Sequence, residues 1–313
     1  MTKGSLAVII PAYKSEFLDK TLDSLDRQTD KNFTVYIGDD ASPYPIWNTV
    51  SRWTGRLKII YRRFEDNLGG TSLTAHWNRC LDMTADEEFF CMFSDDDIME
   101  ENCVAAFRKA LKKYPNHDVY HFDISIIRSD GSLDRECNSF PAEIAADEFF
   151  ARLYMKEIDA RMPEFIFRTD NFRKCGGFVE FKKAFRSDNA TVMTCAAERS
   201  IRTTSEEKAR ILWRESGINV SCIKTAGHLM ELSDANIAFF FWTHRHFRSL
   251  GKKYPLPIKV ETISILYLFD ELKAYFDRRT LFQEIMQYKP GMKDMKYRLH
   301  VLGKFIFKYM IRK

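Results

Sequence analysis

The sequence predicts an α/β protein in which a mostly parallel central β-sheet has helices on both faces and a helical extension follows at the C-terminal end. Short β-branched and apolar runs alternate with segments of helical period over the first hundred residues, which is typical of parallel strands joined by helices. The chain has 313 residues, with 26 Phe and 13 Tyr but only 13 Gly and 9 Pro, so it can bury a core, and a disordered or fibrous protein is excluded.

Each element of this alternation is expected from a local pattern. The run 6–10 is rich in β-branched residues and ends at Pro11, and the segment 16–28 places Leu18, Leu22 and Leu25 on one helix face. The other expected elements are a strand at 33–37, a Pro-punctuated turn at 42–45 with a short helix after it, a strand at 57–61, a helix at about 72–83 and a strand at 88–93. In such a sheet, ligands bind beyond the carboxyl ends of the strands.

The composition changes after residue 250. Residues 251–257 have the composition of a linker, and in the last stretch apolar residues recur at helical spacing among many lysines and arginines. The apolar set is Met295, Leu299, Leu302, Ile306 and Tyr309. Two interpretations are equally open: a helix that packs on the rest of the protein with a solvated basic face, or a helix attached to a membrane surface.

Charge and cysteine content exclude several classes of protein. The formal net charge of +4 is too small by itself to indicate nucleic-acid binding. The seven cysteines are dispersed and have no C-x-x-C spacing, which argues against a disulfide framework and against a zinc site. The first residues lack the apolar region of a signal peptide, and no stretch approaches the roughly 18 apolar residues of a membrane-spanning helix. We therefore expect reduced thiols and a cytoplasmic location, at the inner face of the membrane if the C-terminal helix attaches there.

The most informative feature is the triplet Asp95, Asp96 and Asp97, which directly follows the apolar run 89–93. Adjacent carboxylates repel one another, so such a cluster at the end of a buried strand favours a bound cation or a metal carried by a polyphosphate. The structural alternative is a solvated acidic turn.

Polar residues also follow the other expected strands. The four strand ends carry residues 11–13, residues 39–42, residues 66–67 and the triplet. Because parallel strands end at the same edge of a sheet, we expect these residues to converge on one crevice. Tyr13 can line a nucleotide base, and Asp40 can accept a hydrogen bond from the imide of uracil or the amino group of guanine. For Asp39, a helix cap or an Asx turn is an equally good interpretation.

Five segments in order resemble family 2 inverting glycosyltransferases, which have the GT-A fold, a Rossmann-like α/β architecture. They are VIIPAY at 8–13 with LDSLDRQT at 22–29, VYIGDDAS at 35–42, FSDDDI at 93–98, the stretch from FIFR at 165–168 through KCGGF at 174–178 to Asp188, and WRESGINVS at 213–221. The resemblance spans about 220 residues.

The resemblance implies roles for matching positions. Pro11 and Tyr13 would contact base and ribose, Asp40 would pair with the base, and Asp95 would address the ribose or a metal-bound water. Asp96 would be the main metal ligand, assisted by Asp97. Asp188 would be the general base that takes the proton of the acceptor hydroxyl.

Three positions depart from the family pattern. Ser94 and Ser187 stand where acidic residues are common, so the predicted metal site and base lack these neighbours. Ser72 stands where some members have an arginine that contacts phosphate. Asp188 also has a structural alternative, as the N-cap of a helix at 189–197.

The implied activity is metal-dependent, inverting transfer of a sugar from a UDP-, GDP- or dTDP-linked donor to a hydroxyl of a glycan or lipid-linked acceptor, in surface polysaccharide or glycoconjugate biosynthesis. Mg²⁺ or Mn²⁺ would neutralise the leaving diphosphate, and a base would contribute on the order of 10² to 10⁴ in rate. A glycosidase, with two carboxylates flanking the bond and no nucleotide, fits the strand-end cluster less well. The alternatives are a non-catalytic nucleotide-sugar or carbohydrate-binding module, against which the joint presence of Asp40, Asp96 and Asp188 argues, and a nucleotidyltransferase, for which Lys14 gives little support.

The expected domains are a catalytic domain at 1–222, an active-site loop and connecting helix at 223–250, and a basic helical extension at 251–313. Gly69 and Gly70 are expected in a turn, because no phosphate-loop motif surrounds them. Gly176 and Gly177 are expected where the chain approaches the sheet closely. His228 is a candidate contact to the donor phosphates from a loop that covers them.

Overall fold

The computed structural model describes residues 4–204, 206–217 and 226–256 together with residue 303. The chain forms two compact units, Met1–Cys222 and Ile223–Lys313, which are described separately. The predicted C-terminal basic helix and most of the extension at 251–313 lie outside the described residues.

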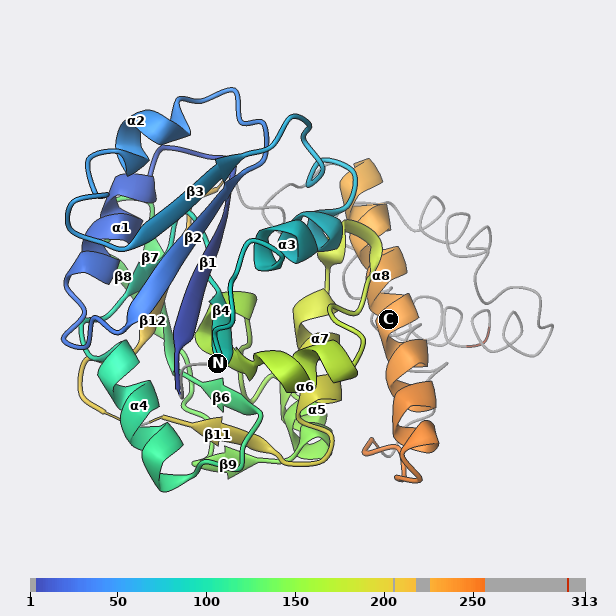
Figure 1. The fold of residues 1–313 in the computed structure, drawn as a ribbon. Helices are drawn as coiled ribbons and strands as arrows, with labels where there is room; N and C mark the ends of the chain where they lie inside the picture. The colour runs from blue at the N-terminus through green and yellow to red at the C-terminus, as the bar shows by residue number, and fades with distance from the viewer. Residues whose placement is uncertain (1–3, 205, 218–225, 257–302, 304–313) are drawn as a thin grey trace. The chain divides into compact units, whose positions relative to one another are not determined.

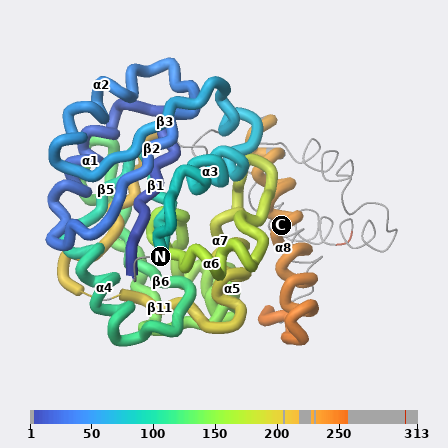
Figure 2. The backbone as a smooth tube through the Cα atoms, in the orientation of Figure 1, coloured from blue at the N-terminus to red at the C-terminus, as the bar shows by residue number. Residues whose placement is uncertain are grey.

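The first unit alternates strands with helices as its sequence predicts (Figures 1 and 2). The strands of its larger sheet are β1 (Leu6–Ala12), β2 (Phe33–Asp39), β3 (Ile59–Arg63), β4 (Phe89–Met92), β6 (Val119–His121), β9 (Glu143–Ile144), β10 (Phe165–Arg168) and β11 (Ile201–Thr203). The strands of its smaller sheet are β5 (Ile98–Met99), β7 (Ile124–Arg128), β8 (Leu133–Glu136) and β12 (Ile211–Glu215). The helices are α1 (Leu18–Asp26), α2 (Ile46–Val50), α3 (Leu73–Leu81), α4 (Cys103–Lys113), α5 (Ala146–Tyr154), α6 (Thr169–Lys174) and α7 (Ser187–Cys195), with 3₁₀ turns η1 (Met162–Glu164) and η2 (Lys182–Ala184).

The eight-stranded sheet has the order β3-β2-β1-β4-β10-β6-β11-β9. Strands β3, β2, β1 and β4 are parallel, as predicted, whereas β10 runs antiparallel to both β4 and β6. Figure 1 shows α1 and α4 on one side of the parallel strands and α3 on the other. The predicted fold class is therefore confirmed.

Burial explains why the apolar runs form central strands. Strand β1 is buried along nearly its whole length because neighbouring strands flank it and helices cover the sheet, which is the pattern of a parallel strand. Helix α1 buries Leu18, Leu22 and Leu25, the apolar face predicted from their spacing. These residues belong to the core that also includes β2 and β4.

The second, four-stranded sheet has the order β5-β12-β7-β8. Strand β5 begins at Ile98, directly after the acidic triplet, and pairs antiparallel with β12. The triplet therefore lies in the short connection between the last parallel strand, β4, and the second sheet.

The described part of the second unit consists mainly of α8 (Ala226–Ser249), a helix of 24 residues. Within the described residues, no helix combines the length and the apolar character that crossing a bilayer requires. The loop expected around His228 is instead the first part of α8, so that expectation was wrong. Helical period was already present there in the apolar residues that follow, such as Leu232, Ala235 and Phe239.

Candidate functional site

The ends of β1 and β4 are joined by hydrogen bonds through Asp95. One carboxylate oxygen of Asp95 accepts from the backbone N–H groups of Tyr13 and Lys14, at 2.9 and 2.8 Å. Burial, reinforced by the charge of Asp96, raises the pKa of Asp95 to about 6, and the two N–H groups oppose that rise. Asp95 therefore fixes the loop after β4 against the loop after β1, and its contacts are with the protein backbone.

Asp96 points toward cationic and hydroxyl groups. Its Oδ2 atom lies 3.7 Å from the Lys14 ammonium and accepts a hydrogen bond of 3.4 Å from the Ser216 hydroxyl. Burial raises the pKa of Asp96, and the Lys14 charge and the Ser216 bond lower it. Both contacts are long for direct interactions, so Asp96 is the member of the triplet that can turn to an added ligand with little loss.

Asp97 faces the interior. It is fully buried, one oxygen accepts from the backbone N–H of Arg214 at 2.8 Å, and the other, Oδ2, has no hydrogen-bond partner. Burial first, and the charge of Asp96 second, hold the pKa of Asp97 well above its usual range. The structure thus brings the three predicted carboxylates together but gives them three different environments.

The carboxylate oxygens of Asp96 and Asp97 are the type of ligand that a hard divalent cation prefers. At the strand ends, Asp96 offers a carboxylate that makes only long contacts, and the next residue, Asp97, has an Oδ2 atom without a hydrogen-bond partner. Among the described residues, no three His, Cys, Asp or Glu side chains converge as a complete ligand set. A cation here would take few protein ligands, which suits Mg²⁺ or Mn²⁺ that also binds phosphate oxygens.

Arg214, on β12, holds the loop that carries the triplet. Its Nε donates to the carbonyl of Asp96 at 2.8 Å, and its Nη1 donates to the carbonyls of Arg128 and Ser129 at 3.1 and 3.0 Å. The guanidinium lies over the ring of Phe17, 4.5 Å from its centroid, and the residue is only 1% exposed. The second sheet therefore positions the acidic loop through a buried cation.

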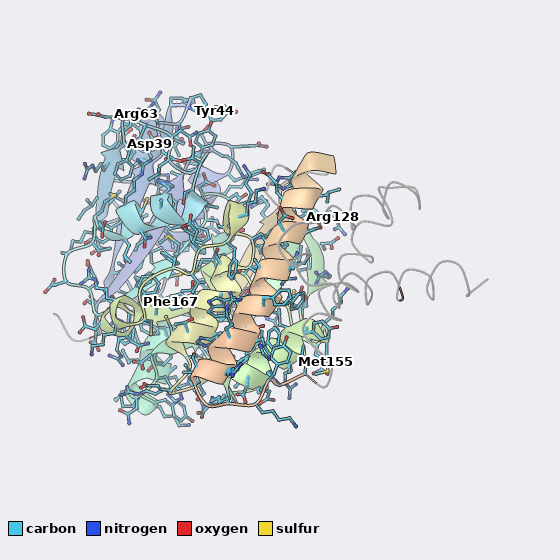
Figure 3. All side chains as sticks on the ribbon, turned by 90° about the vertical axis from the view of Figure 1, so that its right-hand side faces the viewer. Asp39, Tyr44, Arg63, Arg128, Met155 and Phe167 are labelled. Atoms are coloured by element: carbon cyan, nitrogen blue, oxygen red, sulfur yellow. The ribbon has the colours of Figure 1, made fainter. Side chains whose placement is uncertain are left out.

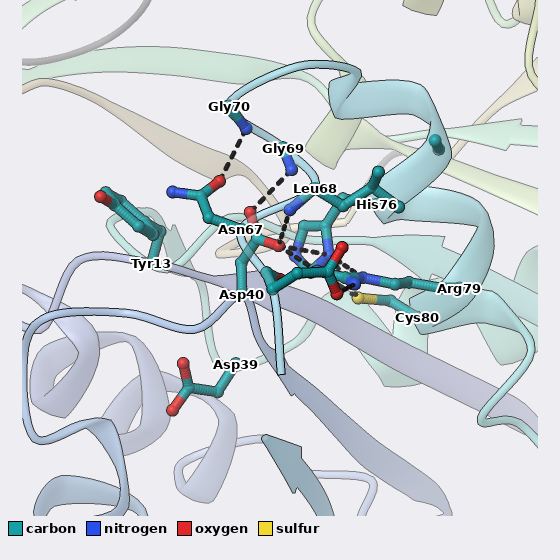
Figure 4. A network of polar contacts seen from close by, with 12 residues as sticks. Tyr13, Asp39, Asp40, Asn67, Leu68, Gly69, Gly70, His76, Arg79 and Cys80 are labelled. Carbon is teal, nitrogen blue, oxygen red and sulfur yellow. Dashed lines mark hydrogen bonds and ion pairs between the residues drawn. The ribbon is translucent and has the colours of Figure 1, made fainter. Parts of the chain in front are cut away.

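Asp40 occupies a dense network at the end of β2 (Figure 4). Its two oxygens accept from the backbone N–H groups of Leu68 and Gly69, each at 2.9 Å. The Arg79 guanidinium pairs with it, and His76 Nδ1 lies 3.4 Å away. Burial lowers the pKa of His76 to about 4, so that imidazole is neutral at physiological pH. The Asp40 carboxylate thus holds the 67–70 loop, and a nucleotide base would have to share it.

Gly69 and Gly70 form the predicted turn, and the reason for the first glycine is now visible. A Cβ atom at Gly69 would lie 2.6 Å from the Asp40 Oδ2 atom, closer than any real contact. The Asn67 side chain caps the same turn by accepting from Gly70 N–H at 2.7 Å. Any side chain at Gly69 would push the carboxylate and the loop apart.

The Asp39 carboxylate is fully occupied by contacts within the protein, which agrees with its interpretation as a turn residue. Its carboxylate accepts from the Ser42 N–H, the Tyr61 hydroxyl and the Arg63 guanidinium, at 2.8, 2.7 and 2.7 Å. Figure 3 labels Asp39 and Arg63 at the same end of the sheet. Ser42 also donates to the carbonyl of Tyr13, at 2.5 Å, which ties the ends of β1 and β2 together. The ring of Tyr13 stays 39% exposed and is available to a ligand, and Pro11 precedes it in β1.

Asp188 comes from another part of the unit, near the start of α7. The helix begins at Ser187, so Asp188 lies inside its first turn, and the alternative that Asp188 is the N-cap was wrong. Arg186 takes the N-cap position with a φ of 70°, and Lys183 and Ala184 also have positive φ, at 57° and 53°. L-residues rarely adopt this conformation, and such strain clusters at functional sites. Burial raises the pKa of Asp188, while Arg186 and Arg161 oppose the rise.

Ser72 and the glycines before Phe178 have structural explanations. Ser72 is the N-cap of α3: its hydroxyl accepts from the Ala75 N–H at 3.2 Å and donates to Glu180 at 2.9 Å. Gly176 and Gly177 have φ of 90° and 82°, and no atom lies within 3.4 Å of a Cβ built at either one. The expected close approach to the sheet was wrong. Glycine is required there by the left-handed backbone.

Sequence reasoning missed the roles of Arg214, Ser216 and Arg161. A signal for Arg214 was present, since an arginine that directly follows an apolar run, 211–213, is rarely buried without a set of acceptors. Arg161 lies over the Trp213 ring, 4.7 Å from its centroid, and has no sequence signal. His228 lies in the second unit, and its predicted contact with donor phosphates stays a prediction.

The chain is similar to one known family and to several solved structures. The family model described as Glycosyl transferase family 2 matches residues 7–173, more than half of the chain. Residues 1–349 of S. aureus TarS in complex with UDP-GlcNAc are similar at a TM-score of 0.61 and 18% identity, covering 96% of this chain and 80% of that one. The mannosyltransferase PcManGT from Pyrobaculum calidifontis, in complex with GDP-Man and Mn²⁺, is similar at a TM-score of 0.52 and 14% identity, covering 97% and 87%. No curated protein sequence matches the chain.

Proposed function

Because the chain belongs to glycosyl transferase family 2 and is therefore a glycosyltransferase, we propose that it transfers a sugar, with inversion, from a nucleotide diphosphate donor to a hydroxyl of a glycan or lipid-linked acceptor. The observation that carries this proposal is the junction of strand ends around the triplet. Asp95 is fixed by the N–H groups of Tyr13 and Lys14, and Asp96 is turned toward Lys14 and Ser216. This junction puts an exposed aromatic ring, a cation and a weakly engaged carboxylate at one edge of a parallel sheet, where nucleotides bind.

In this proposal the nucleotide lies against Pro11 and Tyr13, with Asp40 at the floor of the base pocket and Asp95 near the ribose. Asp96, supported by Asp97, would hold Mg²⁺ or Mn²⁺, which neutralises charge on the leaving diphosphate. Lys14 adds a positive charge beside Asp96, 3.7 Å from its Oδ2. Two of the similar structures are complexes with UDP-GlcNAc and with GDP-Man and Mn²⁺, which supports a nucleotide-sugar donor for this chain as well.

Asp188 is proposed as the base. As the acceptor oxygen bonds to the anomeric carbon and the bond to the diphosphate breaks on the opposite face, the acceptor proton moves to an Asp188 oxygen. Burial raises the pKa of Asp188 toward neutral pH, where a general base is more effective. The charges of Arg186 and Arg161 oppose this rise and favour the ionised form of Asp188.

We further propose that residues 1–222 form the catalytic domain, that residues 223–250 carry the connecting helix and that residues 251–313 form a basic extension attached to the membrane surface. Deletion of the residues after Tyr288 tests this attachment. If the deleted form and the full chain partition equally between membrane and soluble fractions, the attachment is refuted.

The main test measures donor binding and transfer separately. Thermal unfolding is followed with UDP-, GDP- and dTDP-sugars, each with and without Mn²⁺, and turnover is then measured with the donor that stabilises. We expect Asp96→Ala to lose the metal-dependent stabilisation and Asp188→Ala to keep donor binding but lose about 10² to 10⁴ in turnover. Asp134→Ala is the matched control, because Asp134 is a surface carboxylate on β8 that pairs with Arg128. Near wild-type turnover of either site variant would refute its assignment.

A further inference from the structure

We propose that Cys175 and Cys195 form a reactive thiol pair that is oxidised by small-molecule disulfides and that crosslinks α6 to α7. Cys175 directly follows α6, and Cys195 is the last residue of α7. The Cys175 sulfur lies 3.7 Å from the carbonyl oxygen of Thr194, the residue before Cys195. The Asn171 side chain of α6 donates to the carbonyl of Cys195 at 2.9 Å. The ends of the two helices are therefore held together at both cysteines.

The two thiols differ in pKa and in exposure, which suits them to different steps of a thiol–disulfide exchange. A hydrogen bond from the Cys195 thiol stabilises the Cys175 thiolate and lowers the pKa of Cys175, and the same bond raises the pKa of Cys195. Cys175 is partly exposed, whereas Cys195 is only 3% exposed. Cys175 is thus suited to attack an external disulfide, and Cys195 to attack Cys175 afterwards.

The other described cysteines have the opposite environment. Burial raises the pKa of Cys80 to about 12 and that of Cys137 to about 11, and it also raises those of Cys91 and Cys103. All four are buried. Among the cysteines that the structure describes, Cys175 is therefore the one that combines a lowered pKa with partial exposure.

Cys175 is partly exposed, and the backbone that follows it borders open space. The next residue, Gly176, has a φ of 90°, and a Cβ atom built on it would find no atom within 4 Å.

The chemistry balances with the small disulfide as the oxidant. The Cys175 thiolate attacks one sulfur of the disulfide RSSR, the Cys175–SR bond forms and one RS⁻ leaves. The Cys195 thiol then gives up its proton and attacks the Cys175 sulfur, and a second RS⁻ leaves. In total, two protein thiols lose two electrons and two protons to form one disulfide, and RSSR gains them to form two RSH.

The crosslink would matter because of what it encloses. The segment between the two cysteines carries Asp188 and the positive-φ residues before it. A bond between the two ends of this segment limits how far α7 can shift relative to α6.

The test uses oxidised glutathione and the full chain. Trypsin cleaves after Lys174, Lys182, Arg186 and Arg199, so the two cysteines fall in separate peptides, 175–182 and 187–199. Mass spectrometry of the non-reduced digest should show these peptides joined in the wild type. Cys195→Ser should instead accumulate glutathione on peptide 175–182, and Cys175→Ser should leave peptide 187–199 unmodified. Cys137→Ser is the matched control and should form the crosslink like the wild type.

A second measurement does not depend on the variants folding. In the native wild type at neutral pH, iodoacetamide should alkylate Cys175 at least about tenfold faster than Cys137, because alkylation follows the thiolate fraction and access. Equal labelling of the two, or a Cys195→Ser protein that traps no glutathione at Cys175, would overturn the proposal. Neither readout depends on glycosyl transfer.

Discussion

Replacing Arg214 by Met should destabilise the first compact unit more than any single surface change, because Arg214 joins the second sheet to the acidic loop. The substitution removes three hydrogen bonds to main-chain carbonyls, at 2.8, 3.0 and 3.1 Å, and the contact with the Phe17 ring. Bonds from a charged donor contribute about 1.5 to 3 kcal/mol each, and their full sum is reduced because the buried charge itself costs free energy. We expect a net loss of about 3 to 5 kcal/mol, the range for breaking a buried charged network.

The assay is equilibrium urea unfolding of the full chain at neutral pH, followed by thermal unfolding. For a unit of this size, about 3 to 5 kcal/mol corresponds to a fall in Tm of roughly 6 to 20 °C. Arg152→Met is the control, because Arg152 makes an i,i+4 surface pair with Glu148 on α5 and should change stability by only about 0.3 to 0.5 kcal/mol. Arg214→Lys should fall between the two, since a lysine retains the charge but lacks the planar fork. A loss below about 1 kcal/mol for Arg214→Met would refute the reasoning.

Three further predictions concern neighbouring groups. The pKa of Asp95 is raised from 3.8 to about 6, so its contribution to stability is fully present below pH 3.8 and is lost as the pH rises through 6. Without divalent cations, the free energy of unfolding of Asp95→Asn, measured with urea, should therefore rise by about 3 kcal/mol relative to that of the wild type between pH 3.8 and neutral pH. A difference between the two proteins that stays constant over this range would contradict the reasoning. The rate of transfer should fall as the pH drops through the raised pKa of Asp188. Because Arg161 lowers that pKa, Arg161→Met should move the acidic limb of the kcat/KM profile to higher pH, and a shift to lower pH would count against the assignment. Gly69→Ala should cost about 1 to 3 kcal/mol in thermal or urea unfolding, because its Cβ would lie 2.6 Å from the Asp40 carboxylate, whereas Gly55→Ala, with no atom within 4 Å, should be nearly neutral.

The parallel half of the fold was predictable because its signal is local. Strands β1 and β4 are continuous apolar runs apart from Pro11, β2 and β3 begin with apolar and β-branched residues, and α1 carries one apolar face, so their type and order follow from local pattern. The antiparallel strand β10 and the second sheet were not predicted, because the local pattern of β10 does not set its direction and β5 has only two residues. Pairing partners are set by tertiary packing, which short-range patterns do not encode.

For the site, too, one part was predictable from the sequence and the other was not. Residues at strand ends, such as Tyr13 and the triplet, could be named because the sheet topology places them together. What each one contacts could not be read from the sequence. Asp95 and Asp97 both accept backbone N–H groups, from 13–14 and from Arg214, and these bonds depend on the folded positions of distant loops. The start of α7 was also missed, because its N-terminus is set by a strained backbone at Arg186 and by no capping side chain.

The network around Asp40 has a consequence for how donor binding should be measured. Two backbone N–H groups and one guanidinium already hold this carboxylate before any ligand arrives, so the 67–70 loop is preorganised and little conformational entropy remains to be lost on binding. A change at Asp40 would therefore weaken binding in two ways, by removing an acceptor and by releasing the loop. The second effect should appear in the free protein as faster amide exchange at Leu68 and Gly69, and only the remainder of the lost affinity would report a direct contact with the base.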